Sequence, residues 1–172
     1  SSDLSMRLAA FSLHAQTLNS AQPFWWEAPS DDESTNCFVT AFDFNRDGYD
    51  ELVAKGDHFL QIYYGGAAPF PAGVDPKTRV WAELGHVAAT VYDGAIVADA
   101  DGDHEAEILY TYRTNSPKGG LRVLESAHFP WPTARPIWNQ YSYFHAGIND
   151  DLSVPRTQQK HWLEMGGIYA VA

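Results

Sequence analysis

Short runs of apolar, aromatic and β-branched residues alternate with polar turns through the central part of the chain. Runs of this length, bounded by Gly, Asn and Asp, are typical of β-strands joined by turns. The pattern predicts six strands: Cys37–Phe42, Leu52–Lys55, Phe59–Tyr64, Ala95–Ala98, Ile108–Tyr112 and Leu121–Leu124. We therefore expect an all-β fold.

The predicted strands form two copies of one pattern, in which a strand enters an acidic loop, a second strand leaves it and a third follows a turn. The first loop begins at Asp43 and the second at Asp99, 56 residues later. Repetition at a fixed period indicates an array of similar units, such as propeller blades. We expect a propeller-like array of short antiparallel sheets with two to three blades, fewer than a closed propeller needs, flanked by extended N- and C-terminal segments.

Three segments follow from this pattern. Residues 1–22 are predicted as an N-terminal arm or first strand, with a short helix over Leu4–Leu18 as the alternative. Residues 23–155 form the β domain, which opens with a predicted loop over Pro23–Thr35. Residues 156–172 are a C-terminal tail that could form a strand. Because an incomplete array leaves sheet edges unpaired, both ends are candidates for donation to a neighbouring chain.

The net charge of the chain limits the classes of partner that it is expected to bind. The chain has 11 basic and 22 acidic residues, for a net charge of −11. A field of that sign repels phosphate backbones and anionic lipids, so we expect no nucleic acid partner and no membrane insertion. One cysteine, Cys37, cannot form an internal disulfide and does not reveal the redox compartment.

The acidic residues are concentrated in the two loops, where their spacing suggests a metal site. Oxygen-bearing side chains occupy loop positions 1, 3, 5 and 9, and calcium takes about six to eight oxygen ligands from carboxylates, amides and carbonyls. Position 7 would add its carbonyl oxygen. The candidate calcium ligands are Asp43, Asn45, Asp47, Tyr49 and Glu51 in the first loop, and Asp99, Asp101, Asp103, Glu105 and Glu107 in the second. The sequence therefore predicts two Ca²⁺ sites.

The spacing of these loops has two alternative interpretations. An EF-hand needs a bidentate Glu at position 12, and that position holds Ala54 in the first loop and Tyr110 in the second. The second interpretation, an acidic turn held without metal by Asx hydrogen bonds to the backbone, remains open.

The two loops differ at position 6. Gly48 suits a sharp turn, whereas His104 would adopt a left-handed backbone at a cost of about 1 kcal/mol. We expect the second site to bind more weakly unless its aspartates compensate.

The loops carry a family resemblance. Asp-Phe-Asn-Arg-Asp-Gly-Tyr-Asp-Glu-Leu at 43–52 and Ala-Asp-Ala-Asp-Gly-Asp-His-Glu-Ala-Glu-Ile at 98–108 resemble the FG-GAP/VCBS repeats of integrin-α-like β-propellers. The segments 134–143 and 148–155 look like a stretch that follows the last such repeat in bacterial surface proteins. The resemblance implies a secreted or cell-surface protein whose loops bind calcium for structure.

The sequence gives weaker support for zinc binding, catalysis or sugar binding than for calcium binding. The seven histidines show no zinc-ligand spacing, and no Gly-x-Ser-x-Gly elbow appears, so we expect no enzymatic activity. Trp25, Trp26 and Trp131 lie in Pro-flanked segments and are candidates for stacking on sugar rings.

Three functional hypotheses result. The first is a calcium-binding extracellular β domain with an adhesive or structural role, whose partner is a protein or glycan at the cell surface. The second is a homo-oligomeric filament subunit held by strand exchange. The third is a carbohydrate-binding module that uses exposed Trp.

Overall fold

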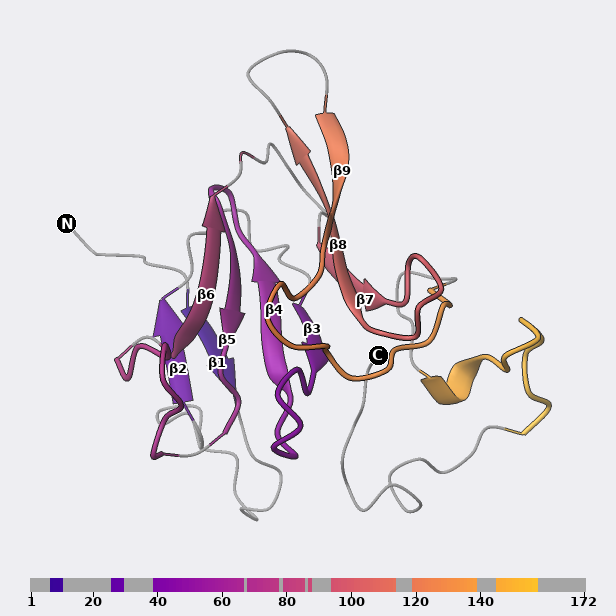
Figure 1. Ribbon diagram of the computed structural model, residues 1–172, viewed down its shortest axis with the longest axis horizontal. Helices are drawn as coiled ribbons and strands as arrows, with labels where there is room; N and C mark the ends of the chain where they lie inside the picture. The colour runs from indigo at the N-terminus through magenta and orange to yellow at the C-terminus, as the bar shows by residue number, and fades with distance from the viewer. Residues whose placement is uncertain are drawn as a thin grey trace.

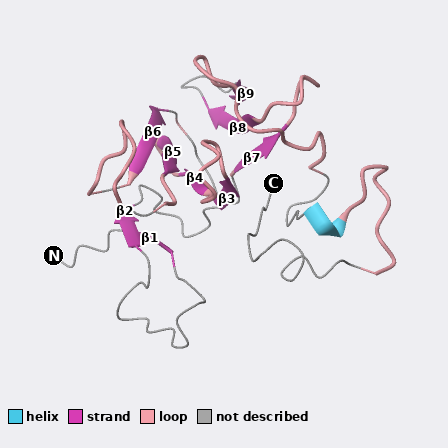
Figure 2. Ribbon diagram, turned by 60° about the horizontal axis from the view of Figure 1, so that its bottom comes forward, coloured by secondary structure: helices cyan, strands magenta, loops and turns pink. Residues whose placement is uncertain are grey.

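The computed structural model describes residues 7–10, 26–29, 39–66, 68–77, 79–85, 87, 94–113, 119–138 and 145–157. Within these ranges strands predominate, and the helical element is the short 3-10 turn η1 (His145–Gly147) (Figure 2). No helix in the described ranges is long and apolar enough to span a membrane. The predicted all-β class is confirmed.

The strands of the described ranges form three antiparallel sheets (Figure 1). The first sheet is a pair, β1 (Arg7–Ala10) with β2 (Trp26–Pro29). The second, in strand order, contains β3 (Val39–Phe42), β4 (Glu51–Lys55), β5 (Phe59–Tyr63) and β6 (Val80–Gly85). The third contains β7 (Ala95–Ala98), β8 (Glu107–Arg113) and β9 (Gly119–Leu124). We call the four-stranded sheet unit 1 and the three-stranded sheet unit 2.

The sequence repeat is also a structural repeat. Phe42 pairs with Glu51 across the first acidic loop, and Ala98 pairs with Glu107 across the second, each position shifted by 56 residues. All four β3–β4 pairs map onto the β7–β8 pairs by the same shift. The units differ at the far edge, because β6 pairs with β5 in unit 1, whereas within the described ranges β9 pairs with β8 alone.

One core lies between the two units. Alternation along the strands turns Phe42, Val53 and Ile62 of unit 1 toward Val97 and Ile108 of unit 2, and all five side chains are buried in one cluster. In addition, the Thr40 hydroxyl donates a hydrogen bond of 2.5 Å to the Ala95 carbonyl, joining β3 to β7. The two sheets therefore pack face to face through their first strands, which lie side by side in Figure 1.

Two departures from the sequence prediction concern strands. Pro23–Thr35 was predicted as a loop, but residues 26–29 form β2, because β1 offers them a complete antiparallel partner. The strand β6 was not predicted, although Ala82 and Leu84 alternate with Glu83 along it and pack toward the core.

The predicted end segments are described in part. Residues 7–10 of the predicted arm form the strand β1, which disfavours the alternative helix over Leu4–Leu18. Of the predicted tail, residues 158–172 lie outside the described residues. In the described part of the chain, the units pack as neighbouring sheets without closing a ring.

Candidate metal centre

The second acidic loop, between β7 and β8, gathers its carboxylates at one place. One oxygen atom from each of Asp99, Asp101 and Glu107 lies within 4.8 Å of the others. Asp99 and Glu107 are buried, at 5% and 2% exposure, whereas Asp101 lies at the surface. Asp103 is also exposed and Glu105 is half-buried, and neither belongs to the group. Three of the five predicted ligands of this loop are thus brought together.

Backbone N–H groups hold these carboxylates in place. Glu107 Oε2 accepts a hydrogen bond from the Ala100 N–H at 2.6 Å, so the last loop residue closes onto the second. The two oxygens of Asp99 accept from the Gly102 N–H at 2.6 Å and the His104 N–H at 3.2 Å. The loop therefore curls around Asp99, as alternate side chains must if they are to converge.

The curl requires left-handed backbone at loop positions 4 and 6 in both loops. Residues Arg46 and Gly48 of the first loop have φ of 62° and 86°, and Gly102 and His104 of the second have 87° and 74°. Each loop therefore carries one glycine and one non-glycine at these positions. The expected left-handed conformation of His104 is confirmed. The left-handed conformation at position 4 was not predicted from the sequence.

The first loop, between β3 and β4, repeats the hydrogen bonds of the second. Glu51 Oε2 accepts from the Phe44 N–H at 3.0 Å, and Asp43 Oδ2 accepts from the Gly48 N–H at 2.9 Å. These bonds match Glu107 to Ala100 and Asp99 to His104 by the 56-residue shift. The two loops therefore share one fold, which the repeated sequence dictates.

The acidic side chains of the first loop do not gather at one place as those of the second loop do. Within the described residues its acidic side chains do not form a group of three like that of the second loop. The Tyr64 hydroxyl donates to Asp47 Oδ2 at 2.8 Å, and the Asn45 amide lies 3.4 Å from Glu51 Oε1. Tyr49, the predicted carbonyl ligand, is 49% exposed. In this arrangement Asp47 is hydrogen-bonded to the hydroxyl of Tyr64, the residue that follows β5.

Burial raises the pKa of the carboxyl groups at the base of each loop. Burial is the largest cause for Glu51, whose pKa rises to about 8, and nearby aspartates add to it while the Phe44 N–H opposes it. The pKa of Glu107 is raised for the same reasons, burial first. The pKa of Asp50 rises to about 6 through burial and the charge of Asp43. Each of these shifts favours the protonated form of the carboxyl group relative to an exposed one.

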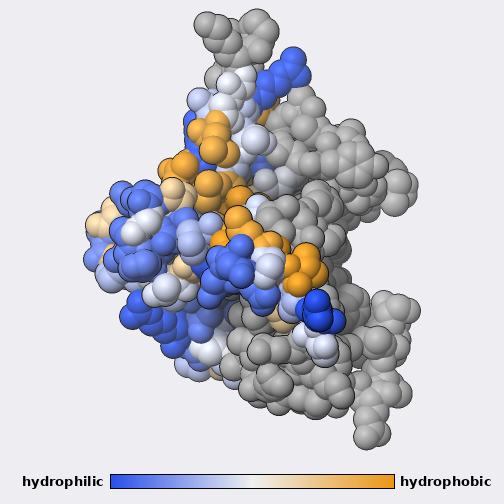
Figure 3. Space-filling model, turned by 90° about the vertical axis from the view of Figure 1, so that its right-hand side faces the viewer, coloured by the Kyte–Doolittle hydropathy of each residue, from blue (hydrophilic) through white to orange (hydrophobic). Residues whose placement is uncertain are grey.

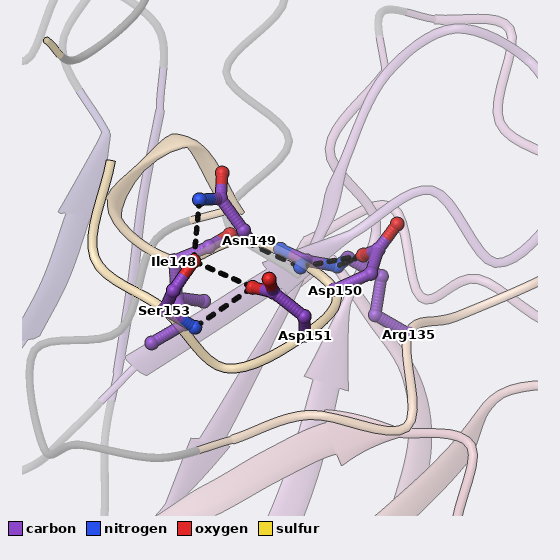
Figure 4. Close-up of polar contacts among 6 residues, drawn as sticks. All are labelled: Arg135, Ile148, Asn149, Asp150, Asp151 and Ser153. Carbon is purple, nitrogen blue, oxygen red and sulfur yellow. Dashed lines mark hydrogen bonds and ion pairs between the residues drawn. The ribbon is translucent and has the colours of Figure 1, made fainter. Parts of the chain in front are cut away.

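Contacts made by Arg135, outside the second loop, hold the base of that loop in place. The Asp99 N–H donates to the Arg135 carbonyl at 3.2 Å, which ties the loop base to the segment after β9. The Arg135 guanidinium contacts Asp150 Oδ1 at 2.7 Å and the Ile148 carbonyl at 3.1 Å (Figure 4). Sequence spacing gave no signal for Arg135 or Tyr64, because both are distant in sequence from the loops that they contact.

The turn bound by Arg135 is organised by its own side chains (Figure 4). Asp151 Oδ1 accepts hydrogen bonds from the N–H of Ser153 at 2.9 Å and from its hydroxyl at 2.5 Å. These bonds lower the pKa of Asp151. The Asn149 amide also donates to the Ser153 hydroxyl at 2.9 Å. These hydrogen bonds order the turn that Arg135 contacts.

The tryptophans predicted to contact sugars are only partly described. Trp131 is half-buried, and its ring meets Phe44 edge to face with centroids 4.7 Å apart. Trp26 lies in β2 and its side chain is not described, while Trp25 lies outside the described residues. A sugar-binding role for these residues stays a prediction.

Calcium suits the donor set of the second loop. Carboxylate oxygens are hard donors, and this loop brings three of them to one place with two of the three buried. Asp99, Asp101 and Glu107 would hold the ion, which would neutralise carboxylates that otherwise repel one another. In the first loop, Asp47 would first have to exchange its bond to Tyr64.

Fold and site together define a class: an all-β chain in which repeated sheet units each carry an acidic loop between their first two strands. No protein-family model matches the chain, and no match was found among curated proteins. The resemblance to FG-GAP/VCBS repeats therefore rests on the sequence motifs of the two loops and of segments 134–143 and 148–155.

Among solved structures, the chain is similar to the biofilm matrix protein Bap1 of V. cholerae. The sequence identity is 26% and the TM-score 0.65, and the match covers 81% of this chain but 23% of Bap1. This chain thus corresponds to less than a quarter of the length of that protein. The match covers most of the fold described above.

Proposed function

We propose that this chain is a calcium-binding, non-catalytic β domain with a structural or adhesive role outside the cell. The observation that carries the proposal is the group formed by Asp99, Asp101 and Glu107, whose oxygens lie within 4.8 Å of one another. A structural ion is favoured over a reacting one because the loop connects two strands and ties its base to a distant segment.

Calcium would act on stability through the loop base. Asp99 and Glu107 are buried, and holding two carboxylates side by side away from water is costly unless a cation neutralises them. Binding of Ca²⁺ neutralises these carboxylates and fixes the loop that joins β7 to β8. Since the Asp99 N–H also bonds to Arg135, the ion would stabilise the segment that follows β9.

The likeness to Bap1 supports the extracellular part of the proposal. Bap1 is a biofilm matrix protein, and its match covers 81% of this chain. Matrix proteins work as structural components, for which a calcium-stabilised β domain is suitable. The surface or matrix partner would be a protein or a glycan.

A thermal melt in calcium, compared with a melt in excess chelator, tests the proposal. An ion at 100 times its dissociation constant should add about 2.7 kcal/mol, which is several degrees for a chain of this length. Asp99→Asn should reduce the gain, whereas Glu125→Gln, at an exposed position outside the loops, should retain it. Magnesium serves as the ionic control.

Equal melting temperatures in calcium and chelator would exclude a structural calcium role. A gain that Asp99→Asn leaves intact would place the ion elsewhere. A gain of the same size in magnesium would show a general charge effect rather than a calcium site.

A further inference from the structure

Residues 131–135 connect the two acidic loops. At one end, the Trp131 ring meets the Phe44 ring edge to face, with centroids 4.7 Å apart. At the other end, the Arg135 carbonyl accepts a hydrogen bond of 3.2 Å from the Asp99 N–H. Figure 1 shows the chain after β9 passing from the side of β3 and β4 to the side of β7. We call residues 131–135 the bridging segment.

Each end of the bridging segment reaches a predicted calcium ligand. Phe44 is the second residue of the first loop, and its N–H donates to Glu51 Oε2 at 3.0 Å. Asp99 is the first residue of the second loop, and its carboxylate belongs to the group of three formed with Asp101 and Glu107. The bridging segment therefore lies between the base of the first loop and the carboxylates of the second.

The bridging segment is anchored within the molecule. Ala134 is 6% exposed and belongs to the core cluster that also contains Phe44 and Ala106, a residue of the second loop. The chain continues into Ile137, which forms a small apolar cluster with Ile148. Figure 3 views the side of the molecule on which η1 lies, where hydrophobic residues form a band beside hydrophilic ones. A segment packed in this way transmits a displacement of either end through its contacting side chains.

The contact at Trp131 is not a product of the sequence repeat. The 56-residue shift maps Phe44 onto Ala100. Phe44 is 1% exposed, and its ring also meets that of Phe42, with centroids 4.9 Å apart. Ala100 is exposed and has only a methyl group. The first loop therefore carries at position 2 an aromatic ring that the second loop lacks, and this ring contacts the bridging segment.

We propose that the bridging segment couples the two acidic loops, so that calcium bound by the second loop orders the base of the first. This inference rests on the proposed function, because the ion in the second loop is the effector. An ion that fixes Asp99 also fixes the N–H that binds Arg135, and through the bridging segment it holds the Trp131 ring against Phe44. Ordering the base of the first loop in advance lowers the entropic cost of binding there. The coupling is reciprocal, so an ion in the first loop raises the affinity of the second by the same factor.

Amide hydrogen exchange measured by NMR, in calcium and in chelator, tests the proposal. The double variant Asp43→Asn with Asp47→Asn removes two charges of the first loop, which leaves the second loop as the calcium site. In this variant calcium should slow exchange of the Phe44 N–H about fivefold or more, the lower end of typical coupling between sites. The Gly56 N–H, which donates to the Phe59 carbonyl at the turn between β4 and β5, is the control for global stabilisation and should slow less.

Substitution of Trp131 in the same background tests the route. Trp131→Ala removes the ring that contacts Phe44, so calcium should slow the Phe44 N–H no more than the Gly56 N–H. The Ala100 N–H of the second loop should still be slowed, because that loop keeps its ion. Trp131→Phe keeps an aromatic ring and should retain part of the effect. Phe129→Ala, at a 49% exposed ring two residues before the bridging segment, is the matched control and should retain all of it.

Calorimetric titration of the same samples with calcium separates this inference from the proposed function. Absence of calcium binding would overturn the proposed function, and the coupling with it. Calcium binding in which the Phe44 N–H slows no more than the Gly56 N–H would overturn the coupling alone. Retention of the full Phe44 effect in Trp131→Ala would show that the bridging segment is not the route, and would also overturn the proposal. Should the double variant fail to fold, Asp47→Asn alone replaces it, with the same result expected.

Discussion

In calcium-free solution the folded state should lose stability as the pH rises from 5 to 8, and Glu51 is the main source of this loss. Its side chain is fully buried, and burial raises its pKa from 4.5 to about 8. Between those values the folded state holds a proton that the unfolded state has released. Stability therefore falls with rising pH in this window.

The size of the effect follows from proton linkage. One proton held by the folded state alone changes the free energy of unfolding by up to about 1.4 kcal/mol per pH unit. For a chain of this length, each kcal/mol shifts the melting temperature by roughly 2–4 °C. The raised pKa values of Asp50 and Glu107 act in the same direction.

Urea unfolding followed by tryptophan fluorescence, at several pH values in chelator, measures this slope. Glu51→Gln should flatten it, because the amide resembles the protonated carboxyl and does not titrate. Glu125→Gln, at an exposed position, should leave the slope unchanged. Calcium should oppose the loss, because the ion binds the deprotonated carboxylates. A stability that rises between pH 5 and 8 in chelator, or a slope unaffected by Glu51→Gln, would refute the reasoning.

Three further substitutions test the loops and the contact between the units. Gly48→Ala should cost about 1 kcal/mol in urea unfolding because φ is +86°, whereas Gly85→Ala, which has equal space and no positive φ, should cost less. Thr40→Val should cost about 1–3 kcal/mol by the same assay, since it leaves a buried carbonyl of β7 without its hydroxyl donor; Thr40→Ser should recover part of the loss. Tyr64→Phe should free Asp47 from its hydrogen bond and strengthen calcium binding by the first loop, measured by calorimetry; unchanged binding would show that the bond does not compete with the ion.

The sequence was most informative where local pattern and structure agree. Alternating apolar residues and two Asp-rich turns predicted β3–β4 and β7–β8, and the fixed spacing predicted that both pairs share one register. The loop curl at Gly48 and His104 also followed from the sequence, since a sharp turn needs left-handed backbone at that position.

Long-range contacts could not be predicted. The strand β6 is joined to β5 by a long connection with little pattern, and its pairing depends on the edge that β5 offers. The bonds from Tyr64 to Asp47 and from Asp99 to Arg135 join residues far apart in sequence, so no local spacing reveals them. The sequence also showed no sign that the carboxylates of the second loop gather as a group of three and those of the first loop do not, within the described residues.

Calorimetric titration of the chelator-treated chain with calcium tests the central claim most directly, for the wild type and for Glu107→Gln and Glu51→Gln. Both substitutions keep an oxygen acceptor for the backbone N–H that each glutamate binds, and both remove the charge. We predict saturable binding by the wild type, loss of the tightest site in Glu107→Gln, and a smaller change in Glu51→Gln. Absence of saturable binding by the wild type, or equal binding by Glu107→Gln, would contradict the account.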